Sequence, residues 1–256
     1  MLALIGMGLD TGDISAKALE FISSADVVIL ESYTSVIGSG CVEFIEMKTG
    51  KKLHKLERRS FEEDLGATVR LALNSTVAIL VIGDPLIATT HRIIISEAKR
   101  QGIETVVMHS SSILSAAIGE SGLDVHRFGP YITIPFWSAH YQPTSFISKI
   151  AKNKDNNEHT LVLLDIDQVS GNSMRIDDAV KIIGQAQSRG GSEVISKNDQ
   201  VLVLANVGRP NQKIFYLKFG SLAMPPQGLE GQVISLIIPA KLSVIEEEFL
   251  ESSTFQ

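Results

Sequence analysis

The stretch VAILVIGDPLIATT, from Val77 to Thr90, decides how the fold is interpreted. Its first six residues are all apolar, a run that is typical of a strand buried on both faces of a parallel sheet. The run ends directly at Gly83-Asp84-Pro85. Two interpretations of this junction are open: a turn that caps the following helix, or the mouth of a binding site that contains Asp84.

The residues around Asp84 favour a fixed direction for its carboxylate. Pro85 has a fixed φ and disfavours the helical conformation in the residue before it, so we expect Asp84 to be extended. Thr89 or Thr90 is a suitable N-cap for a helix that runs to about Arg100. Open α/β sheets bind ligands beyond the carboxyl ends of their strands, and Asp84 follows such an end.

Apolar runs and helical periodicities alternate on both sides of this strand. They predict strands at 2–8 (with a closing glycine turn), 26–31, 51–56, 77–82 and 103–109, and helices at 14–24, 62–73 and 90–100. Because the links between these elements are short, we expect a mostly parallel sheet with helices on both faces.

The rest of the chain has a different pattern. It predicts a short helix that ends at residue 122, helices at 173–188 and 244–250, and strands at 131–135, 160–166, 200–208, 213–220 and 232–239. Several of these strands follow one another without a helix, which favours a mixed or antiparallel sheet. We therefore predict an α/β protein with an N-terminal α/β domain at 1–109 and a C-terminal α/β domain with a mixed sheet at 110–256.

The composition is that of a soluble globular protein, with 44% hydrophobic and 20% charged residues among 256. The net charge of −6 disfavours nucleic acid as a partner. Cys41 is the single cysteine, which favours a reducing, cytoplasmic location. The start, MLALIGMG, lacks the basic region of a signal peptide, and no apolar run reaches the ~20 residues of a membrane span.

Several common site motifs do not fit the sequence. The glycines at 6, 8 and 12 approach the dinucleotide fingerprint G-x-G-x-x-G, but the third comes one residue late, so a plain turn and a ligand loop both remain open. The six histidines have no partner at metal-ligand spacing, and we expect no metal site. The motifs G-x-S-x-G, H-E-x-x-H and G-x-x-x-x-G-K-[ST] are absent.

Two further segments each have two interpretations. KTGKKLHKLERR, from Lys48 to Arg59, fits the rim of a site for an acidic or macromolecular partner, but a solvated face is the preferred interpretation. PFWSAHYQPTSF, from Pro135 to Phe146, groups aromatic residues that fit a lid or substrate wall, or packing between domains.

The order of several segments resembles that in the diphthine synthases, a branch of the tetrapyrrole methylase superfamily of S-adenosylmethionine-dependent methyltransferases. The segments are LALIGMGL, DVVILESYTS, GDPLIATTH, EAKRQGIE, SILSAAIGESGL, FGPYITIPFW, PTSFISKI and HTLVLLDI. The resemblance covers nearly the whole chain. Gly-Asp-Pro alone belongs to the wider superfamily, whereas GDPLIATTH together with YTS, PTSF and LVLLDI is specific to the branch.

This resemblance implies a two-domain α/β fold and a homodimer, with S-adenosyl-L-methionine held in the cleft between the domains and S-adenosyl-L-homocysteine as product. It implies that the substrate is translation elongation factor 2, methylated on its 3-amino-3-carboxypropyl-histidine in diphthamide biosynthesis. The donor-binding positions that it carries over are Leu9, Asp84, Ile87, Ser112, Ile113, Leu164, Val207 and Ile234.

Two positions depart from the pattern that the resemblance implies. Asn206 stands where the family commonly has arginine, and Ile234 stands where it commonly has histidine. Ile234 offers backbone contacts but no side-chain hydrogen bond. These departures concern the donor site and the neighbouring substrate contacts.

The implied chemistry accounts for the absence of a catalytic motif, because the donor supplies an activated methyl group and the protein mainly aligns the reactants. The acceptor amine must lose a proton. Asp84 and His109 are both candidates for the base, and neither is assigned this role. For Asp84, the preferred role is a carboxylate that orients the donor. The alternatives are a porphyrinoid or ribosomal RNA methyltransferase of the same superfamily and a non-catalytic donor-binding protein. The late third glycine disfavours a nicotinamide-dependent oxidoreductase.

Overall fold

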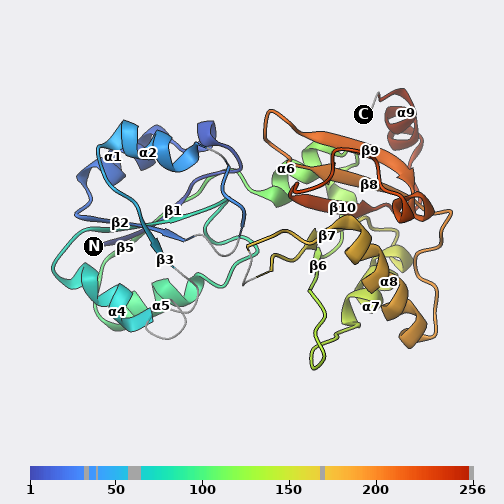
Figure 1. Cartoon of the computed structure of the whole chain (residues 1–256), viewed down its shortest axis with the longest axis horizontal. Helices are drawn as coiled ribbons and strands as arrows, with labels where there is room; N and C mark the ends of the chain where they lie inside the picture. Colours follow the sequence, from blue (N-terminus) through green and yellow to red (C-terminus); the bar gives the residue numbers. More distant parts are fainter. Residues whose placement is uncertain (32–34, 39, 57–64, 168–170, 254–256) are drawn as a thin grey trace. The chain divides into compact units, whose positions relative to one another are not determined.

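A computed structural model describes residues 1–31, 35–38, 40–56, 65–167 and 171–253 (Figure 1). The chain divides into two compact units, Met1–Ile113 and Leu114–Gln256. Each unit contains one five-stranded sheet. The boundary expected from sequence after His109 falls within the first unit.

The sheet of the first unit is parallel and has the strand order β3-β2-β4-β1-β5. Its strands are β1 (Leu2–Gly6), β2 (Val27–Glu31), β3 (His54–Leu56), β4 (Val77–Val81) and β5 (Thr105–Met108). All five residues of β1 and of β4 are buried, as the uninterrupted apolar run predicts. Because β1 lies between β4 and β5 and all three strands are parallel, the loops that follow them meet at one edge of the sheet.

Helices cover both faces of this sheet (Figure 1). Helices α1 (Ala16–Ser24) and α2 (Cys41–Thr49) pack on one face, with Ile22 and Ile45 fully buried. Helices α4 (Leu65–Arg70) and α5 (Arg92–Arg100) pack on the other face. The described residues of this unit also form two short 3-10 turns, η1 (Thr11–Asp13) and η2 (Leu71–Leu73). The alternation of strand and helix therefore gives the two-faced parallel sheet that the sequence predicts.

The sheet of the second unit is mixed and has the order β6-β7-β10-β8-β9. Its strands are β6 (Ile132–Ile134), β7 (Thr160–Leu164), β8 (Gln200–Ala205), β9 (Lys213–Lys218) and β10 (Ile234–Ile238). The β6–β7 pairing is parallel, and the other pairings are antiparallel. The mixed sheet predicted from consecutive strands is therefore confirmed.

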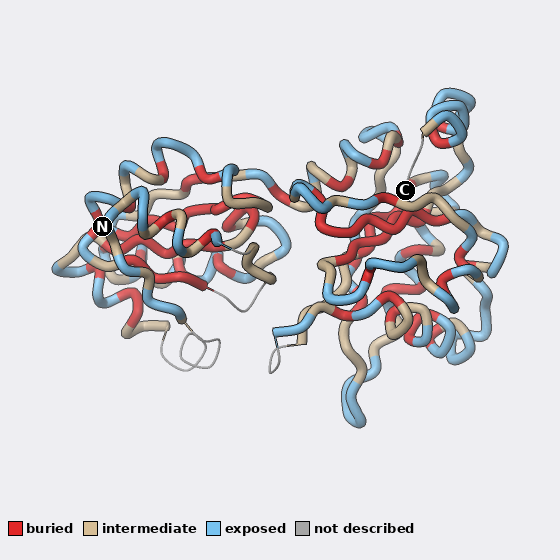
Figure 2. The backbone as a smooth tube through the Cα atoms, turned by 45° about the horizontal axis from the view of Figure 1, so that its top comes forward, coloured by how far each residue is buried: buried red, intermediate tan, exposed pale blue. Residues whose placement is uncertain are grey.

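Helices α7 (Ser145–Asp155) and α8 (Ile176–Gly190) pack against one face of this second sheet and bury Ile150 and Ile183 completely. Figure 2 shows the buried strands of each unit lying inside a shell of partly exposed helices and loops. The described residues also form α6 (Ile113–Glu120), η3 (Val125–Arg127), η4 (Phe219–Ala223) and α9 (Val244–Ser252).

Some expected helix boundaries differ from the structure. Helix α5 begins at Arg92 with His91 in the N-cap position, so the expected Thr89 or Thr90 cap is wrong. The Thr89 hydroxyl instead accepts a hydrogen bond from the His91 backbone N–H and donates one to the Pro85 carbonyl. Helix α8 begins three residues later than expected, at Ile176. Some of the expected features lie outside the described residues. They are the start of the helix expected at 62–73, residues 33–34 of the YTS segment, and residues 57–59 of the basic segment.

Candidate active site

Three loops meet at the carboxyl edge of the first sheet. They follow β1, β4 and β5, the three strands that are adjacent in the sheet. The backbones of Gly8 and Gly83 exchange two hydrogen bonds, with N–O distances of 3.2 and 2.8 Å. A Cβ added to Gly6 would lie 2.6 Å from the Gly83 carbonyl oxygen and 2.9 Å from Pro85 Cδ. Glycine is therefore required here because the loops approach each other closely.

Asp84 lies at the centre of this edge and is only 6% exposed. Its Oδ1 accepts a hydrogen bond of 2.9 Å from the Leu86 backbone N–H, and its Oδ2 lies 2.7 Å from His109 Nδ1. The Ser110 N–H donates a longer bond, 3.4 Å, to the same Oδ2. A carboxylate has about four lone-pair positions. Asp84 therefore has capacity to accept a further hydrogen bond from a ligand.

The loop after β1 is joined to the loop after β5 by a second carboxylate, which sequence reasoning missed. Asp13 Oδ2 accepts hydrogen bonds from the Leu9 N–H at 2.8 Å and from the Ser111 hydroxyl at 2.5 Å. A Cβ added to Gly8, whose φ is +78°, would lie only 2.1 Å from Asp13 Cβ. The signal in the sequence is an acidic residue shortly after the glycine turn, in GMGLDTGD.

A buried ionisable pair adjoins the same edge. His91 Nε2, at the end of the Gly-Asp-Pro loop, lies 3.7 Å from Glu31 Oε2 at the end of β2, and both side chains are inaccessible. Burial lowers the pKa of His91, although the Glu31 carboxylate and the Pro85 backbone act in the opposite direction. His91 is therefore neutral near pH 7. Glu31 and His91 lie far apart in the sequence, so no short motif links them.

The five donor-binding positions expected in the first unit all lie in or beside these loops. Leu9 and Ile113 are half-buried, Asp84 and Ser112 are buried, and Ile87 is exposed. The residue after Ile87, Ala88, has a φ of 55°, which is uncommon for a residue other than glycine. Such backbone strain occurs preferentially at functional sites.

The three expected positions of the second unit also gather at one edge of their sheet. Strand β10 is antiparallel to β7 and β8, and Ile234 at its start pairs with Ala205 at the end of β8. Its neighbour Ser235 pairs with Leu163, so Leu164 at the end of β7 lies at the same edge, as does Val207 just beyond β8. Ile234 and Val207 are buried.

The structure gives a local reason for Asn206. Its φ is 51°, a conformation that asparagine adopts more readily than most residues. Its backbone N–H donates to the Val233 carbonyl at 2.9 Å, and its side-chain oxygen accepts from the Val233 N–H at 3.1 Å. Its side-chain amide also donates to Gln232. Asn206 therefore joins the end of β8 to the start of β10 through the backbone.

The basic and aromatic segments of the sequence have mainly structural surroundings. Within residues 48–56, the lysines lie at or near the surface, and Lys48 lies 5.7 Å from the centre of the Phe44 ring. In the aromatic segment, Phe146 is buried, and Trp137 packs against the core of the second unit. The Arg189 guanidinium lies over the Trp137 ring, 4.7 Å from the ring centre.

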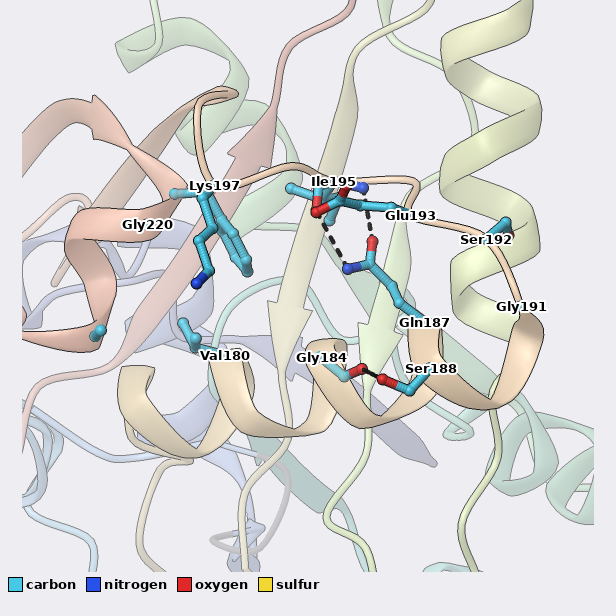
Figure 3. A pocket seen from close by; sticks show the side chains of 12 residues that line it. Val180, Gly184, Gln187, Ser188, Gly191, Ser192, Glu193, Ile195, Lys197 and Gly220 are labelled. Carbon is cyan, nitrogen blue, oxygen red and sulfur yellow. Dashed lines mark hydrogen bonds between the residues drawn. The ribbon is translucent and has the colours of Figure 1, made fainter.

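A concavity of about 470 Å³ lies in the second unit beside α8 (Figure 3). The Gln187 side chain accepts hydrogen bonds from the Val194 and Ile195 N–H groups and donates one to the Ile195 carbonyl. These bonds hold the loop that forms one wall. None of the expected donor-binding positions lines this pocket.

Among the residues that the structure describes, no group of three or more His, Cys, Asp and Glu side chains is arranged to hold a metal ion. In the same part of the chain, no helix has both the length and the apolar composition of a membrane span.

Comparison with known proteins places this geometry in context. The family described as Tetrapyrrole (Corrin/Porphyrin) Methylases matches residues 1–223. The diphthine synthase of Methanothermobacter thermautotrophicus is 38% identical over 251 residues, which are 98% of this chain and 94% of that protein. The human diphthine methyl ester synthase is 36% identical over 234 residues, covering 84% of this chain and 81% of the human protein.

Two solved structures are similar to this chain in fold and in sequence. A crystal structure of a protein from Entamoeba histolytica has a TM-score of 0.86 and 36% identity, covering 98% of this chain and 97% of that one. A crystal structure of a diphthine synthase has a TM-score of 0.85 and 30% identity, covering 98% of this chain and 95% of that one.

Proposed function

Because this chain belongs to the tetrapyrrole methylases and, within them, to the diphthine synthases, we propose which methyl acceptor it uses. The proposed acceptor is the 3-amino-3-carboxypropyl-histidine of translation elongation factor 2, methylated in diphthamide biosynthesis. The proposed donor is S-adenosyl-L-methionine. The observation that carries this proposal is the buried Asp84 carboxylate at the carboxyl edge of a parallel sheet, where such folds bind ligands.

The proposed donor contacts in the first unit come from Leu9, Asp84, Ile87, Ser112 and Ile113. The chemistry of this edge suits the donor. Glycine-built loops let a ligand approach the backbone closely, and Asp84 has capacity to accept a hydrogen bond from a ribose hydroxyl or an ammonium group. In the second unit, the proposed contacts come from the edge formed by Leu164, Val207 and Ile234.

The donor supplies an activated methyl group on a sulfonium. The residues of the chain then have to orient the reactants and exclude water. Holding two reactants in line contributes up to roughly 7–11 kcal/mol to lowering a barrier. The hydrogen bonds among the three loops fix the edge before binding, so that little reorganisation is needed when the donor arrives.

The experiment that tests this function measures methyl transfer from labelled S-adenosylmethionine to two forms of elongation factor 2. One form carries the aminocarboxypropyl-histidine, and the matched control carries unmodified histidine. We expect label on the first form only. Label on neither form, with donor binding intact by calorimetry, would contradict the proposed acceptor and direct attention to porphyrinoid precursors or ribosomal RNA.

The proposed donor site has its own test in Asp84→Ala. We expect the folded variant to bind S-adenosylhomocysteine at least about tenfold more weakly, because it loses a charge-assisted hydrogen bond of the kind worth roughly 1.5–3 kcal/mol. Calorimetry measures the affinity, and circular dichroism verifies the fold. Full affinity in a folded Asp84→Ala protein would remove the assignment.

The proposal extends to assembly and location. We propose a homodimer on the basis of the resemblance. We propose a cytoplasmic location on the basis of the single cysteine, Cys41, which fits a reducing compartment. Light scattering on the purified chain measures the oligomeric state, and a monomer at micromolar concentration would contradict the homodimer.

A further inference from the structure

His109 lies directly after β5, at the same edge as Asp84, and its environment differs from those of His91 and of His159, the residue before β7. Its side chain is 67% exposed, whereas the carboxylate that holds it is 6% exposed. His91 and His159 are completely buried. His109 therefore combines a ring that a substrate can reach with a buried, fixed partner.

The hydrogen bond between the two side chains determines which ring nitrogen carries the proton. An ionised carboxylate only accepts hydrogen bonds, so the Nδ1 that lies 2.7 Å from Asp84 Oδ2 carries the hydrogen. In the neutral ring, Nε2 is then left with its lone pair available. A carboxylate in this position holds the ring orientation and stabilises the imidazolium that forms when Nε2 takes a proton.

We propose that His109 is the general base of the methyl transfer and that Asp84 positions its ring. This inference rests on the proposed function, because the base is needed only if the acceptor is an amine. Asp84 acts through His109 in this role, and its remaining lone pairs are available for the donor.

The proposed reaction moves one proton to His109 and one methyl group to the acceptor nitrogen. Nε2 of His109 takes one proton from the acceptor's ammonium group, and the amine lone pair so released forms the new N–C bond with the donor's methyl group. The C–S bond breaks with its electron pair retained by sulfur, which leaves as the neutral thioether of S-adenosylhomocysteine. The imidazolium, paired with the Asp84 carboxylate, then returns its proton to solvent.

The Asp84 carboxylate is also held from its other side, which keeps the direction of the His109 ring fixed. The Leu86 N–H donates to its Oδ1, and the Ser110 N–H donates to its Oδ2. The Ser110 hydroxyl in turn donates to the Asp13 carbonyl at 3.2 Å. The general base therefore lies in a loop whose position is determined by the two neighbouring loops.

The test compares His109→Ala with His126→Ala, a matched control in which an exposed histidine of the second unit is truncated. General base catalysis contributes roughly 100- to 10,000-fold, so we expect kcat of His109→Ala to fall at least about 100-fold. We expect its affinity for S-adenosylhomocysteine to change by less than about threefold. Added imidazole should restore part of the rate, because the exposed position leaves room for it.

The outcomes separate this inference from the function on which it rests. Wild-type protein that methylates neither form of elongation factor 2 would overturn the proposed function and the base with it. Active wild-type protein together with an equally active His109→Ala would overturn the base alone. Loss of activity without imidazole rescue, but with weakened donor binding, would assign His109 to the donor site instead. His109→Gln, which keeps a polar group of similar size, gives the same comparison if the alanine variant folds poorly.

Discussion

Two pairs of the same chemical kind, an imidazole beside a carboxylate, differ in what surrounds them. In His109–Asp84 the ring is 67% exposed, and the carboxylate accepts one backbone hydrogen bond at 2.9 Å and one at 3.4 Å. In His159–Glu246 both side chains are buried. The first pair leaves a ring nitrogen available for chemistry, whereas both ring nitrogens of the second pair form hydrogen bonds that stabilise the fold. Environment, more than residue type, therefore decides the role of such a pair.

The buried pair holds helix α9 to the second sheet. Glu246, on α9, accepts hydrogen bonds from the backbone N–H groups of Asp124 and Ser243 and from Arg127 and His159. His159 Nδ1 accepts a bond of 3.0 Å from the Ala240 N–H, so its Nε2 donates to Glu246. Both ring nitrogens of His159 are occupied, and no lone pair remains for a substrate.

The largest expected effect comes from removing the carboxylate of the buried pair. Glu246→Leu leaves Arg127 and the His159 ring without their acceptor, a kind of loss that costs about 3–5 kcal/mol. We expect the free energy of unfolding to fall by that amount in urea titrations, whereas Glu248→Leu on the exposed side of α9 should change it by less than about 0.5 kcal/mol. Equal effects of the two substitutions would contradict the structural role of the pair.

The next largest effect is the response of the buried pair to acid. Burial raises the pKa of Glu246, but the backbone N–H groups of Ser243 and Asp124 and the bond to His159 outweigh it and hold the pKa at about 2 instead of 4.5. The unfolded chain therefore binds more protons between these values, so stability present above pH 4.5 is lost as the pH falls toward 2. This loss amounts to roughly 3 kcal/mol.

The acid response is measured by comparing unfolding free energies of wild type and Glu246→Gln across this pH range. We expect the variant to lose the part of the slope below pH 4.5 that Glu246 contributes, because glutamine does not titrate. An unchanged slope in the variant would show that other carboxylates carry the acid sensitivity.

A smaller effect, on turnover, is expected at the exposed pair. In Asp84→Asn the amide can donate to Nδ1 and stabilise the ring tautomer whose Nε2 already carries a hydrogen. We expect kcat to fall by about 10- to 100-fold, equivalent to about 1.4–2.7 kcal/mol. Glu246→Gln is the matched control, and we expect its kcat at saturating substrates to match the wild type while it stays folded. Equal losses of kcat in both variants would remove the distinction between the pairs.

Sequence alone predicted much of the fold because its signals are local. Strand β4, which contains the first five residues of the apolar run, is buried at every residue, and the glycine turns fall where two loops touch. Helix starts were less predictable. His91, rather than a threonine, precedes α5, because the Thr89 hydroxyl bonds to the Pro85 carbonyl within the loop.

The candidate site was predictable only in part. The importance of Asp84 followed from its place after a buried strand. Asp84 follows β4, and its partner His109, 25 positions away, follows β5. Their contact depends on the order of strands in the sheet, in which only β1 lies between β4 and β5, and strand order is not a local property of the sequence. The Asp13–Ser111 bond spans 98 positions, and the bond between His159 and Glu246 spans 87. Such long-range pairs arise from the packing of the whole unit.

The smallest expected effect concerns the backbone beside each pair. Ala88, in the loop that carries Asp84, has a φ of 55°, and Asn157, two residues before His159, has a φ of 58°. Asparagine tolerates this left-handed region better than alanine because its side chain can bond to the local backbone. The two positions therefore have similar φ angles, but asparagine suits such an angle better than alanine does.

Exchanging these residues should have opposite effects on the free energy of unfolding. We expect Ala88→Asn to raise it, and Asn157→Ala to lower it, each by about 0.5–1 kcal/mol, as measured in urea. We also expect Ala88→Asn to leave affinity for S-adenosylhomocysteine within about threefold of wild type, because the side chain is exposed and the backbone angle is unchanged. A more stable Ala88→Asn protein with much weaker donor binding would show that alanine is kept at this position for the ligand rather than for the fold.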